Sequence, residues 1–151
     1  QWVEIYLDRT LINSQWTMKM DTFPNEIELP RPPIVSSGTA TATSVTYTIS
    51  DTQETATLSA SSYRVDRSST PGVIRNLYGQ SWPSHLMDQN SVTVTWWGGY
   101  GAAGSDVPAA IRHAILMHVA HLYERRLASD TMASNEVPFG VKALLDSQKW
   151  G

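Results

Sequence analysis

The sequence predicts an α+β fold in one domain, residues 1–151, in which an antiparallel β region is inserted into a helical bundle. Apolar residues recur at helical spacing near both ends of the chain, in 1–13 and 106–128. Between positions 15 and 100 they alternate with polar residues, which is the period of a half-buried strand. At 151 residues the chain is long enough to bury a core.

The helical segments lie at the two ends. Gln1-Trp2-Val3 already belongs to an apolar periodic segment, so we expect further N-terminal helices that are missing from this sequence. Ser105 or Asp106 can cap a long helix at about 106–128, with Pro108 in its first turn. A C-terminal arm, 137–151, contains a short helix at 141–148.

The long helix carries an apolar stripe at positions 111, 114, 115, 118, 119, 122, 123 and 127. The first helix is too short to cover this stripe. We therefore expect the missing N-terminal helices, or neighbouring subunits, to cover the rest.

The β region is a series of short strands. Trp16, Met18 and Met20 alternate with polar residues and predict a strand at 15–21. Further strands are expected at 44–49, 54–58, 63–66, 73–75 and 92–97, the first two forming a hairpin. The proline run Pro30-Arg31-Pro32-Pro33 is expected to be extended, at a sheet edge or outside a sheet.

Composition excludes several classes of function. The net charge is −3 and the pI near 5.7, so no basic patch recruits nucleic acid or an anionic membrane. No apolar run reaches the roughly 18–20 residues that span a bilayer. Without cysteine there is no disulfide framework and no thiolate metal site. Charged residues make up only 17%, which suggests that partners cover part of the surface.

The residues that could perform chemistry do not form a convincing site. His118, His121 and Glu124 stand at i, i+3 and i+6 of one helix and could share a metal, but facing ligands are lacking, and a core histidine is the simpler interpretation. The glycine run at 98–101 lacks the Gly-Lys-Ser/Thr ending of a phosphate loop. No nucleophile elbow accompanies His85. We expect no catalytic residue, no metal and no cofactor.

Aromatic residues point instead to interfaces. Six Trp and six Tyr against two Phe is an unusual ratio, and Trp and Tyr suit contact surfaces. Trp96 and Trp97 are adjacent in a strand, so they point to opposite faces and one must meet a second layer, a loop or another subunit. The candidates for contacts with a partner protein or a neighbouring subunit are Trp82, Trp96, Trp97, Tyr100, Phe139, Val141, Leu144 and Trp150.

Short stretches from residue 11 onward resemble a known family in order and spacing. Examples are Tyr78-Gly79-Gln80-Ser81-Trp82-Pro83 and Pro138-Phe139-Gly140-Val141 with Leu144-Leu145. The others are 11–16, 21–24, 27–33, 63–66, 92–94, 98–101, 107–112 and 120–126. Together they resemble the phage gp6-like head–tail connector family, in its phiE125 gp8-type branch. The sequence departs from this family at the hairpin turn, where Ser50-Asp51-Thr52-Gln53 replaces an Asp-x-Gly type, and in lacking the N-terminal helices.

The resemblance implies a non-enzymatic structural protein of the virion neck, assembled in the host cytoplasm. Identical copies would form a ring, commonly twelve-fold, beneath the portal protein. The ring would extend the DNA channel, let genomic DNA pass without specific binding, and dock the next neck or tail protein. Helices would build the wall, and the arm at 138–150 would dock on the portal.

An alternative reading is a β-rich tail or baseplate module that binds a glycan through its Trp and Tyr residues. The long helix at 106–128 argues against it, since such a helix does not belong to a β-sandwich lectin. A metal-dependent enzyme using His118, His121 and Glu124 is a more distant alternative.

Overall fold

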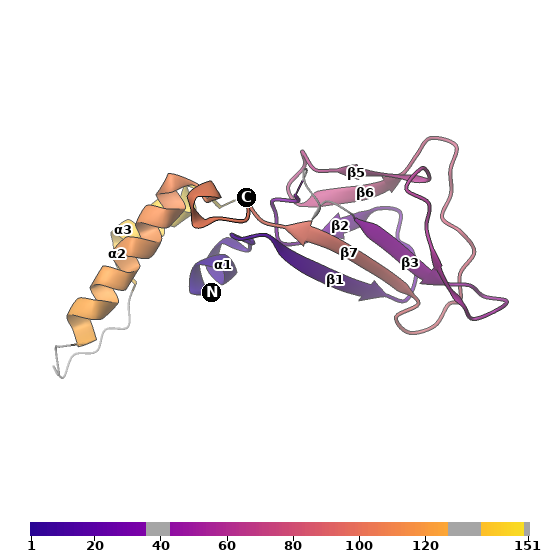
Figure 1. Ribbon diagram of the computed structural model, residues 1–151, viewed down its shortest axis with the longest axis horizontal. Helices are drawn as coiled ribbons and strands as arrows, with labels where there is room; N and C mark the ends of the chain where they lie inside the picture. The colour runs from indigo at the N-terminus through magenta and orange to yellow at the C-terminus, as the bar shows by residue number, and fades with distance from the viewer. Residues whose placement is uncertain (36–42, 127–136, 150–151) are drawn as a thin grey trace.

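The computed structural model describes residues 1–35, 43–126 and 137–149. The molecule is elongated, with its helices at one end and two β-sheets at the other (Figure 1). The helices are α1 (Trp2–Leu7), α2 (Ala109–Arg126) and α3 (Phe139–Asp146), with a 3₁₀ turn, η1 (Gly104–Asp106), before α2. The predicted α+β class is confirmed, whereas the helical bundle remains a prediction.

The first helix is shorter than the expected 1–13. Asp8 takes the left-handed conformation (φ 51°, ψ 42°), and its N–H donates to the carbonyls of Glu4 and Ile5. This geometry ends a helix, because the last carbonyls then have their donor and the chain turns away. Two residues later Thr10 N–H donates to Pro32 O at 3.1 Å, so the chain has already left the helix for the sheet end.

The ends of the other helices also differ from expectation. Asp106 does not cap α2: its Oδ2 accepts the Ala103 N–H at 2.9 Å and closes η1, so α2 begins only at Ala109. α3 begins at Phe139 instead of residue 141. The expected end of the long helix at 128 lies outside the described residues.

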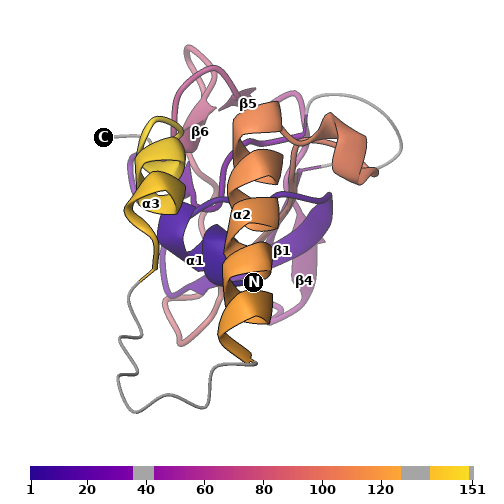
Figure 2. The same cartoon turned by 90° about the vertical axis from the view of Figure 1, so that its left-hand side faces the viewer.

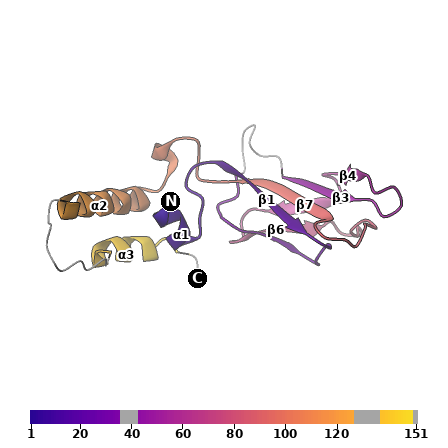
Figure 3. The same cartoon turned by 90° about the horizontal axis from the view of Figure 1, so that it is seen from below.

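Both sheets are antiparallel. One has the order β1 (Ser14–Met20), β7 (Val92–Gly98), β3 (Ser44–Thr48), β4 (Thr55–Thr57). The other has the order β2 (Ile27–Leu29), β6 (Gly72–Asn76), β5 (Tyr63–Asp66). Figure 3 shows β6 of this sheet beside β1, β7, β3 and β4 of the first. The hairpin and the other predicted strands are confirmed; β2 was not predicted as a strand, because three residues before a proline run show too little alternation.

The inner faces of the two sheets share one apolar core. Along β7, Val92, Val94 and Trp96 are at most 2% exposed. They pack in one cluster with Leu29 of β2 and Ile74 of β6, both fully buried. The strict alternation of β7 is what allows one strand to serve a core on one face and solvent on the other.

A second, separate core holds the helices together. Val3 and Leu7 of α1 meet the first half of α2 and the inner side of α3. Tyr6 OH also donates to Asp146 Oδ1 at 2.8 Å, which joins α1 to α3 and raises the Tyr6 pKa. The fully buried residues that α2 and α3 contribute are Ile111, Ala114, Val141 and Leu145.

The two cores are joined where three chain segments cross. Gly98 and Gly99 have no room for a side chain: a Cβ would lie 2.7 Å from Arg31 O and 2.5 Å from Asn13 N, respectively. Gly99 also has φ 142°, which L residues rarely adopt. The glycine run therefore permits close backbone crossing between the sheets and the helices.

We predict that Leu145→Ala lowers the free energy of unfolding by about 2–5 kcal/mol, because it empties a fully buried site between α1, α2 and α3. Lys142→Ala, on the exposed side of the same helix, should change it by less than about 0.5 kcal/mol. Urea unfolding followed by circular dichroism measures both. Equal stability of the two variants would contradict the packing of α3 in this core.

Candidate interaction surfaces

The apolar side chains in the first half of α2 are buried, whereas those in its second half are exposed. Ile111 and Ala114 are covered by α1 and α3, but Val119 and Leu122 are 56% and 55% exposed. Leu116, one turn earlier, is 66% exposed. With the half-buried Ile115 these residues form a lateral apolar strip, here called the α2 face. The expectation that the stripe needs a further cover agrees with this exposure.

An apolar groove continues the α2 face toward the sheets. It has a volume of about 460 Å³ and lies between the segment after α1 and the start of α2. Ile115 and Leu116 belong to both surfaces, so the groove and the α2 face form one continuous apolar area. The apolar side chains that line it are Leu11, Ile12, Val107, Ile115 and Leu116, and Arg112 lines it as well.

The opposite side of α2 is occupied by α3 (Figure 2). A Cβ on Gly140 would lie 3.4 Å from Met117 Cε, which places the start of α3 against that side chain. Phe139, the first residue of α3, is 85% exposed. The helical end therefore has two different flanks, the α2 face on one side and α3 with Phe139 on the other.

The histidines of α2 do not form a metal centre. No group of three His, Asp or Glu side chains with metal-binding geometry occurs in the described part of the chain. The His118 ring packs on the Trp2 ring with centroids 5.0 Å apart, and Glu124 is exposed. His118 is a packing residue at the edge of the helical core, although its Nδ1 has no hydrogen-bond partner there.

Trp82 belongs to an aromatic cluster at the sheet end. Its ring stacks on Phe23 with centroids 4.8 Å apart, and its Nε1–H donates to Pro24 O at 2.7 Å. His85 meets the Phe23 ring edge-on at 5.0 Å. One face of the Trp82 ring and its polar atom are thus used within the chain, which favours a structural role over sugar stacking.

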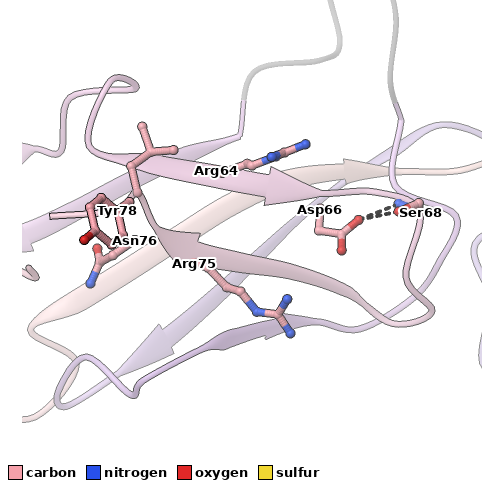
Figure 4. Close-up of a pocket in the computed structure, with 7 residues that line it drawn as sticks. Arg64, Asp66, Ser68, Arg75, Asn76 and Tyr78 are labelled. Atoms are coloured by element: carbon pink, nitrogen blue, oxygen red, sulfur yellow. Dashed lines mark hydrogen bonds between the residues drawn. The ribbon is translucent and has the colours of Figure 1, made fainter. Parts of the chain in front are cut away.

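A pocket of about 510 Å³ lies on the outer face of the β2-β6-β5 sheet (Figure 4). Arg64 of β5 and Arg75 of β6 stand directly opposite each other, with Asp66 nearby and Tyr78 fully exposed at one end. Arg75 forms an ion pair with Glu26 at 3.0 Å. The pocket is a charged, solvated surface, and its hydroxyl–carboxylate pair, Ser68 with Asp66, closes a local turn.

The carboxylate of Asp66, which lines this pocket, accepts hydrogen bonds within a turn. Ser68 Oγ–H and Ser68 N–H donate to Asp66 Oδ1 at 2.6 and 3.0 Å. These bonds stabilise the ionised form and lower the pKa of Asp66 below its ordinary value of 3.8. Because the folded-state pKa is the lower one, the stabilisation is present above the unfolded-state pKa and is lost as pH falls through the folded-state pKa.

The other predicted contact residues are divided between surface and interior. Trp96 and Val141 lie in the two cores, so neither reaches the surface in this conformation. Trp97 is half-buried on the outer face of β7. Tyr100 OH accepts a hydrogen bond from Arg9 Nη1 at 3.3 Å, at the junction. Leu144 is half-buried beside the helical core, and Trp150 lies outside the described residues.

Sequence reasoning missed Leu116 and the groove. Leu116 falls outside the predicted stripe, so helical spacing assigned it to the solvent side. The one signal in the sequence was an apolar residue, Leu116, four positions after Arg112 on the side of the helix expected to face solvent. No helix in the described part of the chain combines the length and the hydropathy that crossing a membrane requires.

Solved structures with the same fold come from a phage-like particle, the gene transfer agent (GTA). A chain in the neck of the empty GTA particle, computed with C6 symmetry, has a TM-score of 0.71 at 20% identity, over 98% of this chain and 71% of that one. A chain in the neck of the native particle, computed with C12 symmetry, has a TM-score of 0.69 at 21% identity, over 98% and 75%. A chain of the native GTA virion gives 0.72 at 19%, over 98% and 71%. At this identity the likeness shows the fold; no protein-family model and no curated protein matches the chain.

We predict that Ser68→Ala raises the pKa of Asp66 toward 3.8, because the carboxylate loses its hydroxyl donor. Ser69→Ala is the matched control, since Ser69 contributes only its backbone N–H, at 3.4 Å. Carboxyl chemical shifts followed by NMR over an acid titration measure the pKa in each variant. An unchanged pKa in Ser68→Ala would contradict the assignment of the cause.

Proposed function

We propose that this chain is a structural subunit of the neck of a tailed phage or phage-like particle, a head–tail connector that works as part of a ring. The observation that carries the proposal is the uncovered α2 face on a fold shared with chains of rotationally symmetric necks. A ring subunit needs an apolar flank for its neighbour, and this chain has one on its longest helix.

The geometry of a ring explains why the flanks differ. Contacts that close a ring are heterologous, so each copy presents two different surfaces, one to each neighbour. The α2 face with its groove is one such surface. The exposed side of α3 is a different surface on the other flank of the same helical layer.

The energetic case rests on the exposed aliphatic side chains. Leu116, Val119 and Leu122 are 66%, 56% and 55% exposed, so burying the rest of each side chain in a contact contributes about 1–2 kcal/mol, before the entropic cost of association. Left in water, a continuous apolar strip of this kind promotes association. Self-association is therefore the behaviour that the surface favours.

The finer parts of the proposal come from the family resemblance. The ring has about twelve copies, sits under the portal protein, extends the DNA channel and docks the next neck or tail protein. Its place is the neck of the virion, after assembly in the host cytoplasm, and the subunit performs no catalysis. C6 and C12 symmetry in the necks that contain similar chains supports such a ring.

We predict that Val119→Lys abolishes ring formation, because it would bury an unpaired charge between copies and weaken self-association by at least about tenfold. Ala60→Lys is the control: it adds the same charge at an exposed position between β4 and β5, outside the α2 face. Native mass spectrometry and negative-stain microscopy of assembled necks measure the outcome. Rings formed by Val119→Lys as readily as by Ala60→Lys would exclude this contact.

Portal docking by the C-terminal segment is best tested at Phe139. Deleting residues 138–151 would remove Val141 and Leu145 from the helical core, so the loss of docking would not be distinguishable from unfolding. Phe139→Ala changes an 85% exposed side chain and should leave the fold intact. We expect it to weaken portal binding about tenfold or more in a pull-down with purified portal, with Lys142→Ala unaffected. Wild-type binding by Phe139→Ala would remove Phe139 from the docking surface.

A further inference from the structure

The outer face of the β1-β7-β3-β4 sheet is almost free of charge. Directly opposite residues in antiparallel strands lie on the same face, so the strand register defines its members. Lys19 is the only charged residue on it, and Trp97 stands at one end. This threonine face consists of Gln15, Thr17, Lys19, Ser44, Thr46, Thr48, Thr55, Thr57, Thr93, Thr95 and Trp97.

The other sheet of the same molecule provides an internal comparison. Its outer face carries a charged residue on every strand: Glu28 on β2, Arg75 on β6, and Arg64 with Asp66 on β5. The high β propensity of threonine accounts for hydroxyl residues on a strand, but not for the absence of the usual charged neighbours. The lack of charge is therefore specific to the threonine face and does not follow from a low content of charged residues in the whole chain.

Neither an ordinary solvent surface nor an ordinary protein interface has this chemistry. Solvated surfaces of soluble domains are about 25–35% charged. The centre of a protein interface is enriched in aromatic residues and Met, whereas here the centre is made of hydroxyls and Trp97 lies at the margin. The hydroxyls remain hydrated, and the β-branched side chains are stiff at χ1.

A surface of this kind fits a polyanion that must pass without being held. Duplex DNA carries one negative charge per about 1.7 Å of axis, so each lysine or arginine that meets a phosphate adds binding and each carboxylate adds repulsion. A face of hydroxyl groups with a single lysine therefore neither binds the phosphates strongly nor repels them. We propose that the threonine face lines the channel for double-stranded DNA in the assembled neck; this inference rests on the ring proposed above.

The test places cations on this face at its two edge strands. Thr17 of β1 and Thr57 of β4 are exposed, so Thr17→Lys with Thr57→Lys should fold and assemble. Particles carrying the double variant should show necks of normal appearance by electron microscopy. Their DNA release, triggered in vitro, should be slowed by at least about tenfold at low salt and recover as salt is raised, because the new phosphate contacts are salt-dependent.

The control adds the same charge elsewhere. Ala60→Lys with Gln80→Lys raises the net charge by the same amount at exposed positions before β5 and after β6. DNA release from control particles should match the wild type. Normal release from the Thr17/Thr57 variant would overturn the inference, and so would loss of neck assembly in that variant alone, since the face would then be a subunit contact. If wild-type necks contain no ring of this chain, the proposed function itself fails, which is a separate result.

Discussion

The structure depends on one close crossing of backbone between its helical end and its sheet end. Gly99 N–H donates to Pro33 O at 2.9 Å, Tyr100 N–H to Leu11 O at 3.1 Å, and Asn13 N–H to Gly101 O at 2.9 Å. Chains can approach this closely only where side chains are absent, which is why the crossing falls on Gly98 and Gly99. The two apolar cores share no buried residue, so these hydrogen bonds, with the Arg31–Asp8 ion pair at 3.5 Å, orient one end relative to the other. In the ring proposed above, this connection would hold the sheet end in a fixed position relative to the helical wall.

Much of the fold could be predicted from the sequence because the strands follow a strict period. Alternation at Trp16, Met18 and Met20 predicted β1, and the adjacent Trp96 and Trp97 were correctly expected to face opposite sides. Helix ends were predicted less well, because they depend on single backbone conformations. The left-handed Asp8 and the η1 turn closed by Asp106 have no periodic signal. β2 was not predicted for a related reason. Its three residues form a strand because they pair with β6, which is distant in the sequence.

The surfaces were less predictable than the fold. Residue type selects Trp and Phe as contact candidates, but burial is decided by packing between elements far apart in sequence. Trp96 is enclosed between two sheets, whereas Phe139 is left outside by the direction in which α3 begins. Leu116 shows the converse: its neighbours on the helix assign it to solvent, and only the proximity of the segment after α1 reveals that it borders an apolar groove. The strand register was equally necessary to show that threonines from four strands form one face.

Only 17% of the residues are charged, and the structure shows which surfaces lack charge. The charged residues are unevenly distributed: the β2-β6-β5 sheet carries them on each strand, whereas the α2 face and the threonine face carry almost none. These two uncharged surfaces differ in chemistry. The α2 face is aliphatic, so removing it from water is favourable, and a copy of the same chain can cover it. The threonine face consists of hydroxyls, so removing it from water brings little gain, and it remains wet. In the ring proposed above, the α2 face would bind the neighbouring copy and the threonine face would leave the DNA unbound, so the helix and the sheet each supply one of the two uncharged surfaces that such a subunit needs.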